Sequence, residues 1–264
     1  MSKLASKPFW LFIIIFFVSQ LAGVIVPIVA NIKLAGNAAS PVSTMAAALL
    51  VANVLGIVLF LLFRPASVTW DSTIAGLRGR NRRRSLLAVA TAVPVVLLLN
   101  ITQELLPELP DLVGKTTFDG IARNPLGCLT ISIVGPVCEE LLFRGGIQTD
   151  LSKRYSHQGW FVPIAMTAAF FAIIHMNPAQ LPVAFAMGLL LGFAYWWTDS
   201  LAAPVFIHIF NNSLACIAYF LSPDDDSIIR QLGGQAGTAI TAAACVLLLF
   251  LAFLAMRKEG FEKA

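Results

Sequence analysis

Two adjacent acids, Glu139 and Glu140, stand at the end of an apolar run, and Arg144 follows four residues after the second. An ionised carboxylate in hydrocarbon costs several kcal/mol, so membrane chains seldom keep one there without a partner and a use. On a helix Glu140 and Arg144 share a face, whereas Glu139 points about 100° away. We therefore predict a structural Glu140–Arg144 ion pair and a working base at Glu139. A buried ion-pair network that contains both acids is the alternative.

A second polar group lies in a later apolar segment, where His208 and Asn212 are four residues apart and share a helix face. An imidazole N–H and an amide NH₂ are donors that can hold a developing oxyanion. Asn211, three residues after His208, could substitute for Asn212. A His and an Asn in a membrane helix can also simply hydrogen-bond across a helix interface. The presence of Glu139, and of His175 in another apolar segment, favours catalysis.

The composition indicates that these residues lie in a membrane protein, because 58% of the chain is hydrophobic and only 12% is charged. The apolar residues come in blocks of roughly 17 to 25, the length that crosses a hydrocarbon core. The sequence predicts an all-α fold, a polytopic membrane helix bundle of about eight transmembrane helices. The first block could be a cleaved signal sequence, but it is long and lacks a good cleavage site, so we expect a retained helix. The predicted spans are residues 9–30, 43–63, 85–101, 121–143, 160–175, 181–197, 201–221 and 236–256.

The basic residues predict the orientation of this bundle. If the spans alternate, most of the 18 Lys and Arg residues fall on the side of the two termini, and Lys33, Lys115, Arg123 and Arg230 fall on the other. The positive-inside rule then puts both termini in the cytoplasm. The basic run Arg78–Arg84 is a topology signal on a solvated loop or a site for anionic lipids. The net charge of +4 therefore requires no nucleic-acid partner.

Depth along the helices predicts where the polar residues meet. At 1.5 Å per residue, Glu139 lies roughly 16 Å from the inner end of a helix that continues to about Asp150, and His208 lies about 14 Å beyond Asp199. His175 falls at a similar depth if its helix starts in the head-group layer at Trp160. We expect one cavity, nearer the cytoplasmic side. The organisation predicted is a single integral membrane domain over residues 1–264, with a motif-bearing core over about 121–221.

Three ordered motifs carry a resemblance to a known family. Glu-Glu-x-x-x-Arg lies at residues 139–144, Phe-x-x-x-His at 171–175, and His-x-x-x-Asn at 208–212. Their order and their spacing of about 30 residues resemble the CAAX protease and bacteriocin-processing (CPBP, or Abi) family of intramembrane proteases. The resemblance covers about residues 138–212.

The resemblance implies an intramembrane endopeptidase, with Phe171 beside the site in a supporting role. Glu139 would activate a water with help from His175, and His208 with Asn212 would stabilise the oxyanion. It also implies a membrane peptide or a lipidated protein as substrate. The family has been described as metalloproteases, and Glu139, His175 and His208 could ligate zinc. No His-Glu-x-x-His motif is present, so a glutamate-type protease without a cofactor is the favoured interpretation.

Two other functions remain open at this point. A proton-coupled transporter would also keep Glu and His residues in the membrane, although its polar residues should reach both faces. A non-catalytic scaffold or immunity protein could keep the motifs without turnover.

Overall fold

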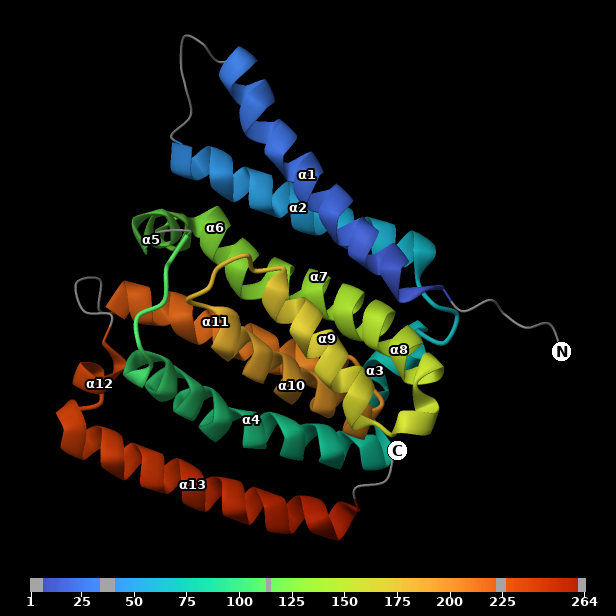
Figure 1. Cartoon of the computed structure of the whole chain (residues 1–264), viewed down its shortest axis with the longest axis vertical. Helices are drawn as coiled ribbons and strands as arrows, with labels where there is room; N and C mark the ends of the chain where they lie inside the picture. Colours follow the sequence, from blue (N-terminus) through green and yellow to red (C-terminus); the bar gives the residue numbers. More distant parts are fainter. Residues whose placement is uncertain (1–6, 34–40, 113–114, 222–226, 261–264) are drawn as a thin grey trace, which may run out of the picture. The chain divides into compact units, whose positions relative to one another are not determined.

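The computed structural model describes residues 7–33, 41–112, 115–221 and 227–260 (Figure 1). Within these ranges 85% of the residues are helical and none lies in a strand. The prediction of an all-α polytopic bundle is therefore confirmed.

Apolar helices occupy the predicted spans. In the described ranges five helices are long and apolar enough to cross a membrane, and three shorter apolar helices accompany them. The long ones are α2 (Pro41–Phe63), α4 (Gly79–Leu105), a composite helix over Pro125–Arg154, α10 (Leu181–Thr198) and α13 (Gly234–Glu259). The shorter apolar stretches belong to α1 (Phe9–Lys33), α9 (Phe161–Ile173) and α11 (Ala202–Leu221). Short helices connect them: α3 (Trp70–Ile74), η1 (Ala75–Leu77), α5 (Lys115–Arg123), η4 (Ser156–Gln158) and α12 (Ile228–Gln231).

The fifth span was predicted to run to residue 175, but α9 ends at Ile173. The predicted bounds of the fourth span differ more from the structure. It was expected over residues 121–143, but the chain breaks at Asn124 and the composite helix runs on to Arg154. The Asn124 side chain accepts hydrogen bonds from the amides of Leu126 and Gly127, and Pro125 occupies the first helical position. Both features define a helix N-terminus, so the preceding residues form the separate helix α5.

The composite helix alternates between α and π geometry. Its parts are α6 (Pro125–Leu129), the π segment η2 (Thr130–Val134), α7 (Gly135–Glu140), the π segment η3 (Leu141–Gln148) and α8 (Thr149–Arg154). The Gly135 amide donates to the Thr130 carbonyl five residues earlier, which is the π register. Glu139 and Glu140 are the last two residues of α7, the six-residue α-helical segment between the two π segments.

The chain divides into two compact units, neither of which is a continuous stretch. Unit 1 holds residues 1–68, 113–157 and 208–221, and unit 2 holds residues 69–112, 158–207 and 222–264. Helix α11 therefore contributes residues to both units. The prediction of one membrane domain over residues 1–264 stays a prediction.

Unit 1 packs α1 and α2 side by side and sets α1 against the composite helix (Figure 1). A Cβ at Gly23 would lie 2.8 Å from the Ala48 carbonyl oxygen, so glycine is what permits the close approach of α1 and α2. The buried carboxylate of Asp150 accepts from the Phe9 amide at 2.9 Å and from Arg154 Nε at 2.5 Å. Asp150 thus ties the start of α1 to the end of the composite helix.

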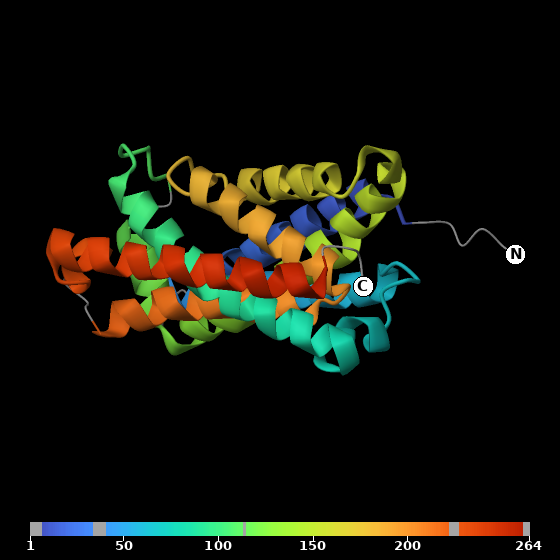
Figure 2. The same ribbon diagram turned by 90° about the horizontal axis from the view of Figure 1, so that it is seen from below.

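Unit 2 pairs α9 with α10 and α4 with α13; the second pair lies side by side in Figures 1 and 2. The buried Arg84, in α4, joins the ends of three helices. Its guanidinium donates to the carbonyls of Trp197 (3.3 Å) and Glu259 (3.1 Å) and lies over the Trp197 ring. Arg83 pairs with the Glu259 carboxylate at 2.9 Å. These two arginines of the run Arg78–Arg84 therefore have protein partners, which leaves fewer of them for lipid.

We predict that Arg84→Ala destabilises the protein and that Arg82→Ala, at an exposed position in the same run, does not. Hydrogen bonds to a charged group contribute about 1.5–3 kcal/mol, and Arg84→Ala removes those to the Trp197 and Glu259 carbonyls. The melting temperature of purified protein in detergent should fall by several degrees for Arg84→Ala only. Equal melting temperatures for the two variants would contradict this role of Arg84.

Candidate active site

The two adjacent acids of α7 have different surroundings. Glu140 is fully buried, whereas 23% of the Glu139 side chain is exposed. Consecutive residues of a helix point about 100° apart, so one carboxylate enters the packed interior while the other faces a more open space. This arrangement fits the predicted division into a structural acid and a working acid.

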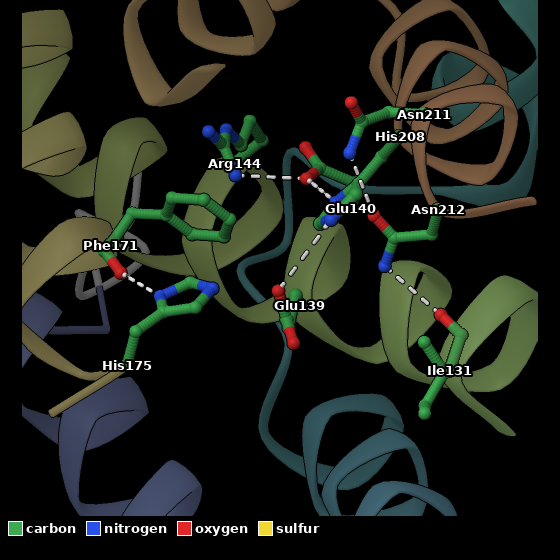
Figure 3. A network of polar contacts seen from close by, with 9 residues as sticks. All are labelled: Ile131, Glu139, Glu140, Arg144, Phe171, His175, His208, Asn211 and Asn212. Carbon is green, nitrogen blue, oxygen red and sulfur yellow. Dashed lines mark hydrogen bonds and ion pairs between the residues drawn. The ribbon is translucent and has the colours of Figure 1, made fainter. Parts of the chain in front are cut away.

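Glu140 is the centre of a buried polar network (Figure 3). Its Oε1 accepts from Arg144 Nη1 at 2.9 Å, and both side chains have no exposed surface. The same oxygen lies 2.8 Å from Nδ1 of His208 on α11. Its Oε2 is buried and has no hydrogen-bond partner among the described residues. The single oxygen Oε1 therefore holds the predicted ion pair and a histidine that the sequence analysis did not assign to Glu140.

The Glu140 contact determines which nitrogen of His208 carries hydrogen. A carboxylate only accepts, so Nδ1 must be the donor in this bond. The other nitrogen, Nε2, lies 3.8 Å from Glu139 Oε2. Nε2 donates a hydrogen bond only when the ring is doubly protonated, and it accepts one when the ring is neutral. The network thus directs the second ring nitrogen of His208 towards the partly exposed Glu139.

Asn212 is fixed by bonds on both sides of its amide. Its Nδ2 donates to the Ile131 carbonyl in η2 at 3.0 Å, and its Oδ1 accepts from Asn211 Nδ2 at 2.9 Å (Figure 3). Asn211 therefore supports Asn212 in the structure, where the sequence analysis considered it as a substitute. The Ile131 carbonyl is a component that the sequence analysis missed, because a backbone group has no residue-type signal.

His175 lies just beyond the end of α9, in unit 2. Its Nδ1 is 2.7 Å from the Phe171 carbonyl, and its ring meets the Phe171 ring edge-on with centroids 4.9 Å apart (Figure 3). A carbonyl only accepts, so Nδ1 carries the hydrogen and Nε2 of the neutral ring is an acceptor. Glu139 belongs to unit 1, so the convergence of His175 with Glu139 stays a prediction.

In the part of the chain that the structure describes, no group of three or more His, Cys, Asp or Glu residues is placed to hold a metal ion. The expectation of a site without a cofactor and its alternative, a zinc ion held by Glu139, His175 and His208, both stay predictions.

The fold and the site together define a polytopic helical membrane protein with a buried Glu–Arg–His network beside a partly open acid. Comparison with known families agrees with this description. Residues 122–214 match the family of Rce1-like type II CAAX prenyl endopeptidases. This match supports the resemblance to the CPBP family of intramembrane proteases, and the matched segment contains all three motifs.

Two curated relatives are similar to part of the chain. The chain is similar to the "Membrane-embedded CAAX protease MroQ" of Staphylococcus aureus, with 32% identity over 108 residues, which are 39% of this chain and 44% of that protein. It is also similar to the "Putative membrane peptidase YdiL" of Bacillus subtilis, with 31% identity over 103 residues, which are 39% of this chain and 41% of that protein. The match spans less than half the length of either relative. No solved structure matches the chain.

We predict that Arg144→Ala destabilises the protein far more than Lys153→Ala, an exposed position in α8 of the same composite helix. Removing one partner of a buried ion pair costs about 3–5 kcal/mol, because the other charge stays buried without compensation. Chemical unfolding in detergent measures the difference. The double variant Glu140→Gln/Arg144→Gln should recover part of the loss, since neither charge then remains.

A stability loss for Arg144→Ala no larger than that for Lys153→Ala would contradict the assignment of the ion pair. So would a double variant whose loss equals the sum of the losses of Glu140→Gln and Arg144→Gln alone, because the effects of residues that interact directly are not additive.

Proposed function

We propose that the protein is an intramembrane endopeptidase of the glutamate type, which hydrolyses a peptide bond with an activated water. The observation that carries the proposal is the approach of His208 Nε2 to Glu139 Oε2 at 3.8 Å, in a network that Glu140 and Arg144 hold in place. A partly exposed acid can take a proton from a water, and a ring nitrogen beside it is placed to bind the oxyanion that forms next to the acid.

Water activation uses the acid and the second histidine. Glu139 takes a proton from the water, and His175, whose Nδ1 is bonded to the Phe171 carbonyl, offers Nε2 as an acceptor for the water's other hydrogen. The hydroxide oxygen then forms a bond to the scissile carbonyl carbon, and the carbonyl oxygen becomes the oxyanion. Glu139 returns its proton to the leaving amine as the carbon–nitrogen bond breaks.

Stabilisation of the oxyanion falls to His208 and Asn212. His208 Nε2 can donate to it when the ring is doubly protonated, because Nδ1 already donates to Glu140. Asn212 uses one N–H on Ile131, and the second N–H of the same amide is the donor assigned to the oxyanion.

The substrate class and the orientation follow from the same proposal. A site carried by membrane-spanning helices accepts a membrane peptide or a lipidated protein tail, delivered through the bilayer. The excess of Lys and Arg on the side of the termini supports cytoplasmic termini and a site that opens towards the cytoplasm. The exposed arginines of the run Arg78–Arg84 are the candidates for contact with anionic lipid head groups.

We predict that Glu139→Gln abolishes cleavage by the purified protein and leaves its melting temperature near that of the unmodified chain. The amide cannot take a proton from water, whereas its size matches that of the acid. Glu108→Gln, an exposed position in unit 2, is the matched control and should keep full activity. The measurement is peptide cleavage in lipid vesicles, with a library of lipidated and unlipidated peptides.

Turnover by Glu139→Gln at the rate of the unmodified protein would remove Glu139 as the base. Absence of cleavage by the unmodified protein across the library would favour a non-catalytic scaffold. The same assay with a metal chelator separates the two protease types, because a glutamate-type enzyme should keep its rate when the chelator is added.

A further inference from the structure

Asn212 forms its key bond with a backbone carbonyl inside another helix. The acceptor, Ile131, lies in the π segment η2 of the composite helix, 81 residues before Asn212 in the chain. Carbonyls inside a regular helix already accept an intrahelical amide hydrogen, so a side chain from outside must normally compete for one. Some feature of this helix must therefore leave the Ile131 carbonyl available.

Pro136 supplies that feature. The amide of Gly135 donates to the Thr130 carbonyl, five residues back, so the next amide in this register would donate from residue 136 to Ile131. Residue 136 is proline, which has no N–H. The intrahelical donor for the Ile131 carbonyl is thus missing, and Asn212 Nδ2 lies 3.0 Å from this oxygen.

The proline also explains why the helix widens at this point. Its ring collides with the carbonyl four residues earlier in an α-helix, and a π turn before the proline relieves the collision. If residue 136 carried an N–H and the segment returned to α geometry, the Gly135 amide would donate to Ile131 instead. In either register an ordinary residue at position 136 lets the backbone occupy the acceptor that Asn212 uses.

We propose that Pro136 is a positioning residue for Asn212, because it reserves the Ile131 carbonyl for the Asn212 amide. The carbonyl fixes the NH₂ end of the side chain, and Asn211 fixes the oxygen end. The second N–H of Asn212 has no hydrogen-bond partner among the described residues, and these two bonds fix the direction in which it points. The catalytic consequence rests on the proposed function, in which that N–H binds the oxyanion.

A spectroscopic test of the positioning does not require activity. Residues 131–132 are the only Ile-Ser step in the chain, so ¹³C-carbonyl isoleucine with ¹⁵N serine selects the Ile131 carbonyl in an NMR spectrum of the full chain in detergent. Asn212→Ala should shift this carbonyl signal upfield, because the carbonyl loses its donor. In a Pro136→Ala background the same Asn212→Ala change should leave the signal in place. An unmoved signal in the first comparison, or equal shifts in both backgrounds, would overturn the proposal.

The kinetic test uses the same variants. Pro136→Ala should lower kcat roughly tenfold or more with little change in KM, since a donor aimed at the oxyanion acts on the transition state. Adding Asn212→Ala to the Pro136→Ala protein should then lower its activity little further. Lactic acid in place of residue 136, which lacks the N–H as proline does, should restore kcat. If the NMR shifts appear as stated but Asn212→Ala leaves kcat unchanged, the positioning stands and the oxyanion role fails.

Discussion

The carboxylate of Glu140 has no exposed surface, and one of its oxygens binds both the guanidinium of Arg144 and the imidazole of His208. A buried charge is stable only with such partners, so these three side chains have to be placed together. Glu140 and Arg144 come from one helix and His208 from another, which makes the network a link between the composite helix and α11. That link orients the His208 ring and turns its second nitrogen towards Glu139. The proposed chemistry at Glu139 thus depends on an acid that does not itself react.

The backbone of the composite helix contributes as much as its side chains. Two π segments flank the short α segment that carries the acids, and π segments inside α-helices occur frequently at functional sites. The first of them presents the Ile131 carbonyl to Asn212, so a second link joins this helix to α11. One link fixes a base and its neighbouring imidazole, and the other fixes an amide donor. Two side chains on α11, four residues apart, are therefore held by two different parts of the same partner helix.

The sequence predicted the helical bundle and the Glu140–Arg144 pair because both follow from local rules, namely apolar length and the i,i+4 spacing. It could not show that His208 bonds to Glu140, since the contact joins positions 68 residues apart. The burial of Arg84 was also missed, because the sequence does not distinguish a buried arginine from an exposed one within a basic run. The start of the composite helix could have been predicted from Asn124-Pro125, a capping residue followed by a proline in the first turn. The predicted span began before this signal. Pro136 was a visible signal for the π segment, but its effect on Ile131 depends on the hydrogen-bond register.

The hydrogen bond from His208 to Glu140 can be tested by ¹⁵N NMR of the His208 imidazole in the full chain, assigned by comparison with His208→Gln. The proposed site requires that Nδ1 carries a hydrogen and donates it to Glu140. The state of Nδ1 determines whether Nε2 donates or accepts a hydrogen bond beside Glu139. The contact with Glu140 predicts a protonated Nδ1 in the unmodified protein and a changed Nδ1 signal in Glu140→Leu. A neutral ring with hydrogen on Nε2 and none on Nδ1 would contradict it.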